Sequence, residues 1–133
     1  NNNATVPSRK HDSDIGYDIS SSVDALIPSK EVQLINTGIA INLPNQCAGF
    51  VLPRSGLASQ HKITLINSPG LVDPGYTGEL MVPLINHGST DYQISIGDRI
   101  AQLVLINTNS VEFKIVDNLP DTERSTGGFG STD

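Results

Sequence analysis

Short apolar or alternating runs, separated every few positions by Gly, Pro, Asn or Ser, constrain the fold of this chain most strongly. Runs of this length and spacing are typical of β-strands, and helical periodicity is nearly absent. The predicted strands cover residues 32–37, 38–43, 48–53, 63–67, 79–86, 92–96, 99–106 and 111–116. This density of strands predicts an all-β sandwich, jelly roll or small barrel.

A single short helix and a polar C-terminal segment complete the predicted organisation. The sequence SGLASQHK at residues 55–62 suits about two helical turns, with Ser55 as the predicted N-cap. From Asn118 the strand pattern ends, and small residues surround one aromatic residue and one arginine. We therefore predict a β-barrel domain over residues 1–117 and a flexible C-terminal arm over residues 118–133.

Charge and composition exclude several classes of protein. The net charge of −6, with a pI near 4.8, does not favour binding along the backbone of DNA or RNA. No apolar run approaches the roughly 20 residues of a membrane span, and residues 1–14 lack a signal-peptide core. Cys47 is the only cysteine, which excludes an internal disulfide and suits a reducing compartment. We therefore expect a protein that is neither secreted nor membrane-bound: cytoplasmic, or located in the nucleus or in the cytosol of a viral host if it is not bacterial.

The segment Asp73-Pro74-Gly75-Tyr76 has the composition of a tight turn. Pro74 suits the second position, and Gly75 suits the positive φ that a type II turn needs at its third position. The turn by itself leaves two interpretations of Asp73 open. It is either an ordinary first turn residue or a carboxylate directed at a substrate.

Two arginines lie beside groups that suit an anion. Arg54 directly precedes the predicted helix, where unpaired backbone N–H groups and the Ser55 hydroxyl would favour a phosphate. Arg124 lies in the glycine-rich RSTGGFGST, where the backbone can approach a ligand and Phe129 can stack on a flat base. A solvated arginine at a capped helix and a disordered tail remain open as alternatives. The histidines lack the spacing of a metal site.

Five segments follow one another along the chain: DIGYDIS, PRSGLA, NSPGLVDPGYTGE, GDRIAQLV and RSTGGFGST. In this order and spacing they resemble the five motifs of the trimeric dUTPase family (deoxyuridine triphosphate nucleotidohydrolases). The resemblance implies a jelly-roll-like β-barrel, the dUTPase-like β-clip, that hydrolyses dUTP to dUMP and pyrophosphate by attack of water on phosphorus. It also implies Mg²⁺ held by the triphosphate and waters, and a homotrimer in which three subunits build each active site. The C-terminal arm would close over a neighbour's site. Such an enzyme limits uracil incorporation into DNA and supplies dUMP for dTMP synthesis.

The resemblance also implies a role for individual residues. Asp73 would orient and activate the hydrolytic water, and Asp18 would contact the magnesium ion only through water. Tyr76 would pack on the deoxyribose and exclude a ribose 2′-OH, while Phe129 would stack on the uracil. The residues expected to bind phosphate are Arg54, Ser55, Gly56, Gln102, Arg124, Ser131 and Thr132. The residues expected to bind uracil or deoxyribose are Asn67, Gly70, Val72, Tyr76 and Phe129.

Three positions depart from the family's motifs. Ile15 replaces a small residue, Ser125 replaces a common glycine, and Asp133 ends the chain where glycine is frequent. The last two lie in the arm, so they concern the details of its closure.

Two other functions are weighed against this one. dCTP deaminases share the fold and parts of the second and third motifs, but they carry a Glu where this chain has Pro83. A non-catalytic β-barrel binding module would give Asp73 no role beyond the turn. The deaminase would release ammonia from dCTP, and in the binding module the arm would gain no protection from proteolysis when nucleotide is added.

Overall fold

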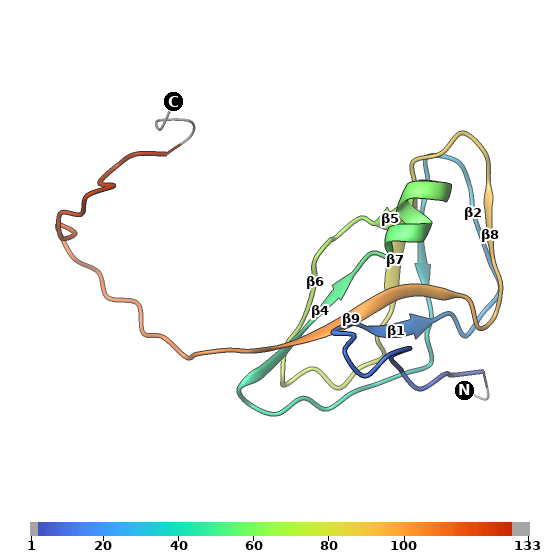
Figure 1. The fold of residues 1–133 in the computed structure, drawn as a ribbon, viewed down its shortest axis with the longest axis horizontal. Coiled ribbons are helices and arrows are strands. Elements are labelled where there is room, and N and C mark those ends of the chain that lie inside the picture. Colours follow the sequence, from blue (N-terminus) through green and yellow to red (C-terminus); the bar gives the residue numbers. More distant parts are fainter. Residues whose placement is uncertain (1–2, 129–133) are drawn as a thin grey trace.

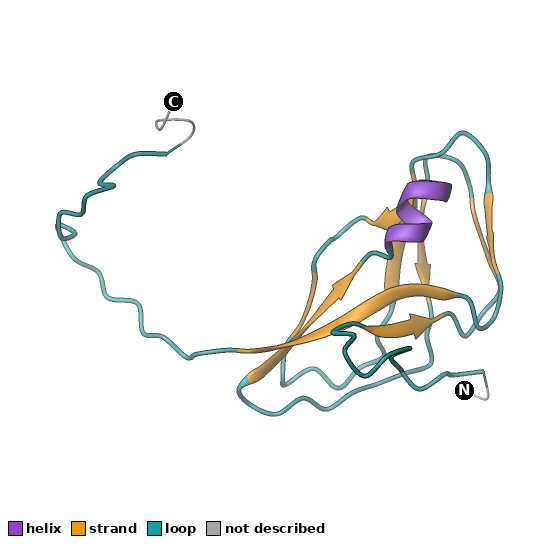
Figure 2. Ribbon diagram, viewed as in Figure 1, coloured by secondary structure: helices purple, strands orange, loops and turns teal. Residues whose placement is uncertain are grey.

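The computed structural model describes residues 3–128 as strands and loops with one short helical segment (Figures 1 and 2). The strands are β1 (Tyr17–Ser20), β2 (Ala25–Ile27), β3 (Val32–Ile35), β4 (Cys47–Leu52), β5 (Ile63–Leu65), β6 (Gly70–Val72), β7 (Val82–Asn86), β8 (Tyr92–Ile94) and β9 (Arg99–Asn107). Neighbouring strands pair in the antiparallel direction. The predicted all-β class is confirmed.

Three small sheets surround one core. The largest has the strand order β1-β9-β4-β6, the second pairs β2 with β8, and the third has the order β3-β7-β5. The long strand β9 pairs with β4 on one side and with β1 on the other. Because β6 is an outer strand of the largest sheet, it leaves a row of backbone groups available to other partners, whereas at the outer edge of β1 the N–H of Asp18 already donates to the carbonyl oxygen of Ser8 (2.8 Å).

The core consists mainly of isoleucine, leucine and valine side chains from all three sheets. In β7, Val82, Leu84 and Asn86 are buried while the alternate residues are only half-buried, as a period of two predicts. The buried amide of Asn86 donates to the carbonyl oxygens of Ile27 (3.0 Å) and Thr90 (2.8 Å), so its burial leaves no donor unpaired. This packing fixes the register of the strands that carry the candidate site.

Two of the predicted strands do not form in the described part of the chain. In residues 38–43 pairing is limited to one isolated bridge between Ala40 and Glu79. Residues 111–116 have no strand pairing, and Figure 1 shows this segment leading away from the body of the molecule. Both predictions are wrong for the single chain, because an alternating pattern forms a strand only where a partner edge lies beside it.

The sequence pattern does not predict β1, β2 or β6. These strands lie in the segments DIGYDIS, VDALIP and SPGLVDPG, where polar and turn-forming residues interrupt the apolar run. The other predicted strands correspond to β3, β4, β5, β7, β8 and β9, with ends that differ by a few residues. Within the described residues, no helix has the length and apolar character needed to cross a membrane.

The predicted helix is present between β4 and β5 (Figure 2). Its π-helical part spans Leu57–His61, and Lys62 follows with a φ of 59° in the left-handed region. The prediction of Ser55 as the N-cap is wrong. The backbone N–H of Ala58 donates to the carbonyl oxygen of Arg54 (3.0 Å), so Ser55 already lies inside the helical turn.

Candidate active site

The predicted turn after β6 is present and carries two of the candidate site residues. The backbone N–H of Tyr76 donates to the carbonyl oxygen of Asp73 (3.0 Å), which closes a four-residue turn. Gly75 does not take a positive φ, so the prediction of a type II turn is wrong. A type I turn also accepts Pro74 at its second position and needs no left-handed residue. The turn therefore fixes Asp73 and Tyr76 without relying on the conformational freedom of glycine.

A pocket of about 200 Å³, which we call the β6 pocket, is lined by residues of β4, β5, β6 and β7 and of the turn. Asn67, Gly70, Val72 and Tyr76, the predicted nucleoside-binding residues in the described part of the chain, line this pocket together with Asp73. Pockets for drug-sized ligands measure roughly 300–1,000 Å³. The β6 pocket therefore suits one ring system better than a whole nucleotide.

Gly70 lets the Asn67 amide lie close to the backbone of β6. A Cβ at Gly70 would lie 3.2 Å from the amide nitrogen of Asn67 and 3.4 Å from the Cβ of Val51. A side chain there would force one of these neighbours to move. Because β6 is an outer strand, its outward N–H and C=O groups and the Asn67 amide can face the same planar ligand.

Tyr76 is fixed at its hydroxyl end. The hydroxyl donates to the backbone carbonyl oxygen of Glu79 (2.8 Å), and a Cβ at Gly78 would lie only 2.7 Å from the same hydroxyl oxygen. The residue is 44% exposed, so part of the ring is available to a ligand. Gly78 thus keeps free the space that the tyrosine hydroxyl occupies.

Glu79 also lines the β6 pocket, although sequence reasoning does not identify it as a site residue. Its Oε1 accepts hydrogen bonds from the backbone N–H groups of Gly38 (2.8 Å) and Thr37 (3.0 Å) and from the amide of Asn36 (3.2 Å). The Gly38 N–H first, and then the Asn36 amide, lower the pKa of Glu79, although burial by itself would raise it. The carboxylate is therefore ionised and fully engaged near neutral pH.

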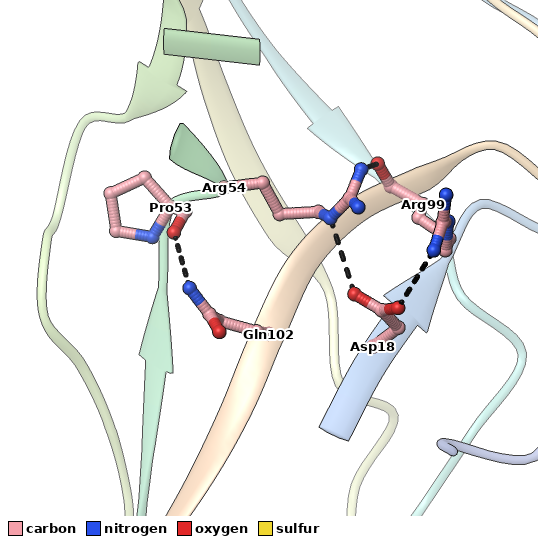
Figure 3. Close-up of polar contacts among 5 residues, drawn as sticks. All are labelled: Asp18, Pro53, Arg54, Arg99 and Gln102. Carbon is pink, nitrogen blue, oxygen red and sulfur yellow. Dashed lines mark hydrogen bonds and ion pairs between the residues drawn. The ribbon is translucent and has the colours of Figure 1, made fainter. Parts of the chain in front are cut away.

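A second group of predicted residues meets where β1, β9 and the end of β4 are neighbours (Figure 3). The Asp18 carboxylate pairs through Oδ1 with Nε of Arg54 and through Oδ2 with Nη1 of Arg99, both at 3.2 Å. Nη1 of Arg54 also donates to the carbonyl oxygen of Arg99 (3.2 Å), and Nε2 of Gln102 donates to the carbonyl oxygen of Pro53 (2.9 Å). We call Asp18, Arg54, Arg99 and Gln102 the arginine cluster.

Arg99 is the member of the arginine cluster that sequence reasoning missed. The sequence feature that could have identified it is its position in the segment GDRIAQLV, three residues before Gln102. An added Cβ at Gly16 would collide with the side-chain amide of Gln102, so the glycine makes room for that side chain. Ser55 and Gly56, also predicted to bind phosphate, are exposed directly after Arg54.

The β6 pocket lies at the β6 edge of the largest sheet, whereas the arginine cluster extends from β1 across β9 to the end of β4. The register joins Asp18 with Gln102 and Gln102 with Leu52, whereas Gly70 is joined with Val51. Three strand spacings of about 4.8 Å separate β1 from β6, which is about 14 Å along the sheet. Asp18 is therefore remote from the β6 pocket, whereas Gln102 and Arg54 lie closer to it, because Leu52 pairs with Gln102 and directly follows Val51 of the pocket lining.

The single chain does not bring Arg124 to either group. Arg124 is exposed, and its Nε donates to the carbonyl oxygen of Gly127 (3.0 Å) in a local turn. Figure 1 shows residues 108–128 running away from the barrel. The other arm residues predicted to bind the nucleotide, which lie outside the described residues, are Phe129, Ser131 and Thr132.

Residues 3–128 contain no group of three or more His, Cys, Asp or Glu that could hold a metal ion. His61 instead packs against Tyr92, with ring centroids 4.9 Å apart. Mg²⁺ usually keeps several waters and binds one or two carboxylates together with substrate phosphates. Both carboxylate oxygens of Asp18 already pair with Arg54 and Arg99, so Asp18 fits contact with such an ion through water better than direct ligation.

A family model described as dUTPase matches residues 2–133. A deoxyuridine 5'-triphosphate nucleotidohydrolase from Gloeothece citriformis is 49% identical over 129 residues, which cover 97% of this chain and 89% of the relative. The protein of the same name from Tropheryma whipplei is 50% identical over 131 residues, which cover 96% and 88%. Sequence similarity thus extends over nearly the whole chain.

The fold is similar to that of solved dUTPase structures. The dUTPase of Staphylococcus bacteriophage 80alpha with dUPNHPP matches with a TM-score of 0.93 and 28% identity, over 100% of this chain and 94% of that one. A mutant dUTPase from phage phi11 of S. aureus, described as revealing how a structural Mg(II) ion is coordinated, matches with a TM-score of 0.86 and 27% identity over 91% and 95%. These similarities confirm the predicted jelly-roll-like fold. With the family model and relatives near 50% identity in agreement, the chain belongs to the dUTPase family.

Proposed function

We propose that this protein hydrolyses dUTP to dUMP and pyrophosphate by attack of water on phosphorus. The observation that carries the proposal is the β6 pocket, where Asn67, Asp73 and Tyr76 lie beside an open strand edge. Relatives that are 49% and 50% identical are named for this activity. The pocket supplies a separate physical reason for the recognition of the base, the selection of the sugar and the activation of the water.

Uracil recognition is assigned to Asn67 and to the backbone of β6, with Gly70 and Val72 forming the adjoining wall. The edge of uracil presents one N–H donor between two carbonyl acceptors. An asparagine amide and a peptide group each offer a donor and an acceptor that can match this edge. Cytosine reverses part of the pattern, so donors in the site would face donors and remain unpaired.

Discrimination against ribose is assigned to Tyr76. The ring lies on the turn beside the pocket, with its hydroxyl bonded to the Glu79 carbonyl oxygen. A ring fixed in this way can pack on the face of a deoxyribose and leave no space for a 2′-hydroxyl. The selectivity is therefore steric, and it depends on where the ring is held.

Asp73 is assigned as the base that orients and activates the attacking water. It is exposed and lines the β6 pocket beside the tyrosine that would contact the sugar. A carboxylate within hydrogen-bonding reach of a water can accept its proton as the bond to phosphorus forms. Such a water is needed beside the α-phosphate of the bound nucleotide.

The triphosphate is assigned to the arginine cluster and to the arm. Arg54 uses Nε and Nη1 in its contacts with Asp18 and Arg99, so its remaining N–H groups can bind phosphate oxygens. Asp18 would contact the Mg²⁺ ion through water, and the ion would neutralise charge on the leaving pyrophosphate. The other residues in this assignment are Ser55, Gly56, Gln102, Arg124, Ser131 and Thr132, with Phe129 stacking on the uracil.

A homotrimer would bring the pocket of one subunit to the arginine cluster of another. The separation of about 14 Å along the sheet between β1, which carries Asp18, and β6, which lines the pocket, supports this arrangement. Val111, Phe113 and Ile115 alternate along an exposed segment, and Phe113 is 93% exposed. Exposed apolar alternation of this kind favours pairing with another chain. Sedimentation equilibrium should give three times the 14.1 kDa of one chain, and a monomer mass at micromolar concentration would contradict the trimer.

The nucleotide preference tests the assignment of the pocket. We expect pyrophosphate release from dUTP to exceed release from UTP, dTTP and dCTP, with kcat/KM at least about tenfold higher for dUTP than for UTP. The measurement is initial pyrophosphate release with Mg²⁺ at matched concentrations of the four nucleotides. Equal values for UTP and dUTP would contradict the role of Tyr76.

The same samples test dCTP deamination. Pro83 lines the pocket at the position where the deaminases carry a Glu, and a proline has no acid or base group. The hydrogen bonds that the Glu79 carboxylate accepts favour its ionised form, so it is not a ready proton donor. We therefore expect no ammonia from dCTP.

The proposed activity would keep uracil out of DNA and supply dUMP for dTMP synthesis. A cytoplasmic location belongs to the same proposal. It is supported by Cys47, a half-buried cysteine that needs no oxidising compartment.

A further inference from the structure

The residue that holds the Tyr76 hydroxyl is itself attached to a distant part of the chain. The backbone carbonyl oxygen of Glu79 accepts the hydrogen bond from Tyr76 (2.8 Å), while the Glu79 carboxylate accepts from Asn36, Thr37 and Gly38. One residue therefore joins the tyrosine to residues 36–38, which follow β3.

Backbone contacts strengthen this attachment. The N–H of Leu80 donates to the carbonyl oxygen of Ile39 (2.8 Å), and the Thr37 hydroxyl donates to the carbonyl oxygen of Leu80 (2.5 Å). Thr37 is fully buried and residues 36, 38 and 39 are half-buried, so this segment is fixed to the packed interior at Thr37. We call residues 36–39 the anchor segment.

The turn that carries Tyr76 has little other support. Asp73, Gly75, Thr77 and Gly78 are all exposed, and Tyr76 is itself 44% exposed. The position of the ring is therefore set at two ends: by the backbone hydrogen bond to Asp73, and by the hydroxyl hydrogen bond to Glu79. Loosening the second end would let the ring swing on the turn.

We propose that Glu79 is a positioning residue that sets the distance between the Tyr76 ring and the sugar, and so determines the preference for deoxyribose over ribose. This inference rests on the proposed function, because it concerns the selectivity of the same pocket. Steric exclusion of a single hydroxyl needs the ring in place to within about 1 Å, since misplacements of that size change rates strongly. Fastening Glu79 to the anchor segment provides that precision.

The chemistry of the contact predicts which substitutions preserve it. In Glu79→Gln the side-chain oxygen still accepts from Thr37 and Gly38, and the Asn36 amide can turn to offer its oxygen to the new NH₂ group. Glu79→Ala removes the acceptor and leaves two backbone N–H groups without their partner. Glu79→Asp keeps the charge but withdraws the carboxylate by one methylene.

The experiment monitors the Tyr76 ring by fluorine NMR and, separately, the preference for dUTP over UTP by kinetics. The chain has three tyrosines, so incorporation of fluorotyrosine gives three fluorine NMR signals, and Tyr76→Phe assigns one of them. Spectra are recorded without nucleotide for the wild type and for each Glu79 variant. In parallel, kcat/KM is measured for dUTP and UTP. Glu31→Ala, which removes an exposed carboxylate elsewhere, is the matched control.

We expect Glu79→Ala to shift or broaden the Tyr76 signal while the signals of Tyr17 and Tyr92 stay in place. The preference for dUTP over UTP should fall at least about tenfold, mainly because UTP becomes a better substrate. Glu79→Gln should keep the Tyr76 signal and retain the preference to within about threefold. Glu31→Ala should match the wild type in both measurements. If Glu79→Ala does not fold, Glu79→Asp should show the same loss.

An unchanged Tyr76 signal with an unchanged preference would overturn the proposal and leave Glu79 with a role in stability alone. A Gln variant as impaired as the Ala variant would also overturn it, because the shared oxygen acceptor would then be irrelevant. A wild-type protein that hydrolyses no dUTP would instead refute the proposed function. The fluorine spectra would still decide whether Glu79 positions Tyr76, so the two failures are distinguishable.

Discussion

Replacing Asp73 with Asn is expected to lower kcat for dUTP by about 10²–10⁴-fold while the protein still folds and binds the nucleotide. The amide keeps the size of the carboxylate but cannot accept a proton from water, and general-base catalysis is worth about this much. Asp73 is exposed, and the turn uses its backbone carbonyl oxygen rather than its side chain. Single-turnover formation of dUMP, together with equilibrium binding of a non-hydrolysable dUTP analogue, measures the two effects.

Asp12→Asn is the matched control for this substitution, because it makes the same chemical change at another exposed position. Both variants should keep the free energy of unfolding within about 0.5 kcal/mol of the wild type, as is usual for surface substitutions. If Asp73→Asn retains most of its activity, the residue serves only the turn and another group activates the water.

Removing residues 124–133 is expected to abolish turnover, by roughly 10³-fold or more, with little loss of stability. The deletion takes away Arg124, and arginines that stabilise the charge of a transferring phosphoryl group contribute on this scale. Residues 120–125 are exposed and contribute nothing to the hydrophobic core, so the barrel should not depend on the arm. Pyrophosphate release and thermal unfolding of the full and shortened chains provide the comparison.

The variant Arg124→Ala tests how much the arginine charge contributes to activity, separately from the rest of the arm. It should lose much of the activity while keeping the arm's length, and both it and the shortened chain should sediment with the same number of subunits as the full chain. A large fall in the melting temperature of the shortened chain would mean that the arm supports the fold, which would contradict its role as a closing segment.

The strands that the sequence predicts well are those whose own side chains alternate between core and solvent. β7 is of this kind, since buried and half-buried residues alternate over its five residues, and in β9 the same alternation covers residues 101–104. β6 has three residues, and it is a strand because Gly70–Val72 lies beside residues 49–51 of β4. A short strand depends on its partner more than on its own pattern. Residues 111–116 are predicted as a strand that does not form. The cause is the same, because their alternating apolar pattern has no partner strand within the described chain.

The sequence predicts most members of the site but not how they are grouped. Asn67, Asp73 and Tyr76 lie within ten residues of one another, so one turn can bring them to one pocket. Arg99 and Glu79 were missed because their partners are 81 and 42 residues away in the sequence. Only the strand order and the path of the anchor segment bring such residues together, and neither can be read from local spacing.

Product analysis with dUTP and Mg²⁺ tests the central claim most directly. The wild-type protein should convert each dUTP into one dUMP and one pyrophosphate, with an oxygen from isotopically labelled water in one of the two products. Asp73→Asn should form the same products far more slowly. Formation of dUDP and phosphate, or recovery of unchanged dUTP, would contradict the account.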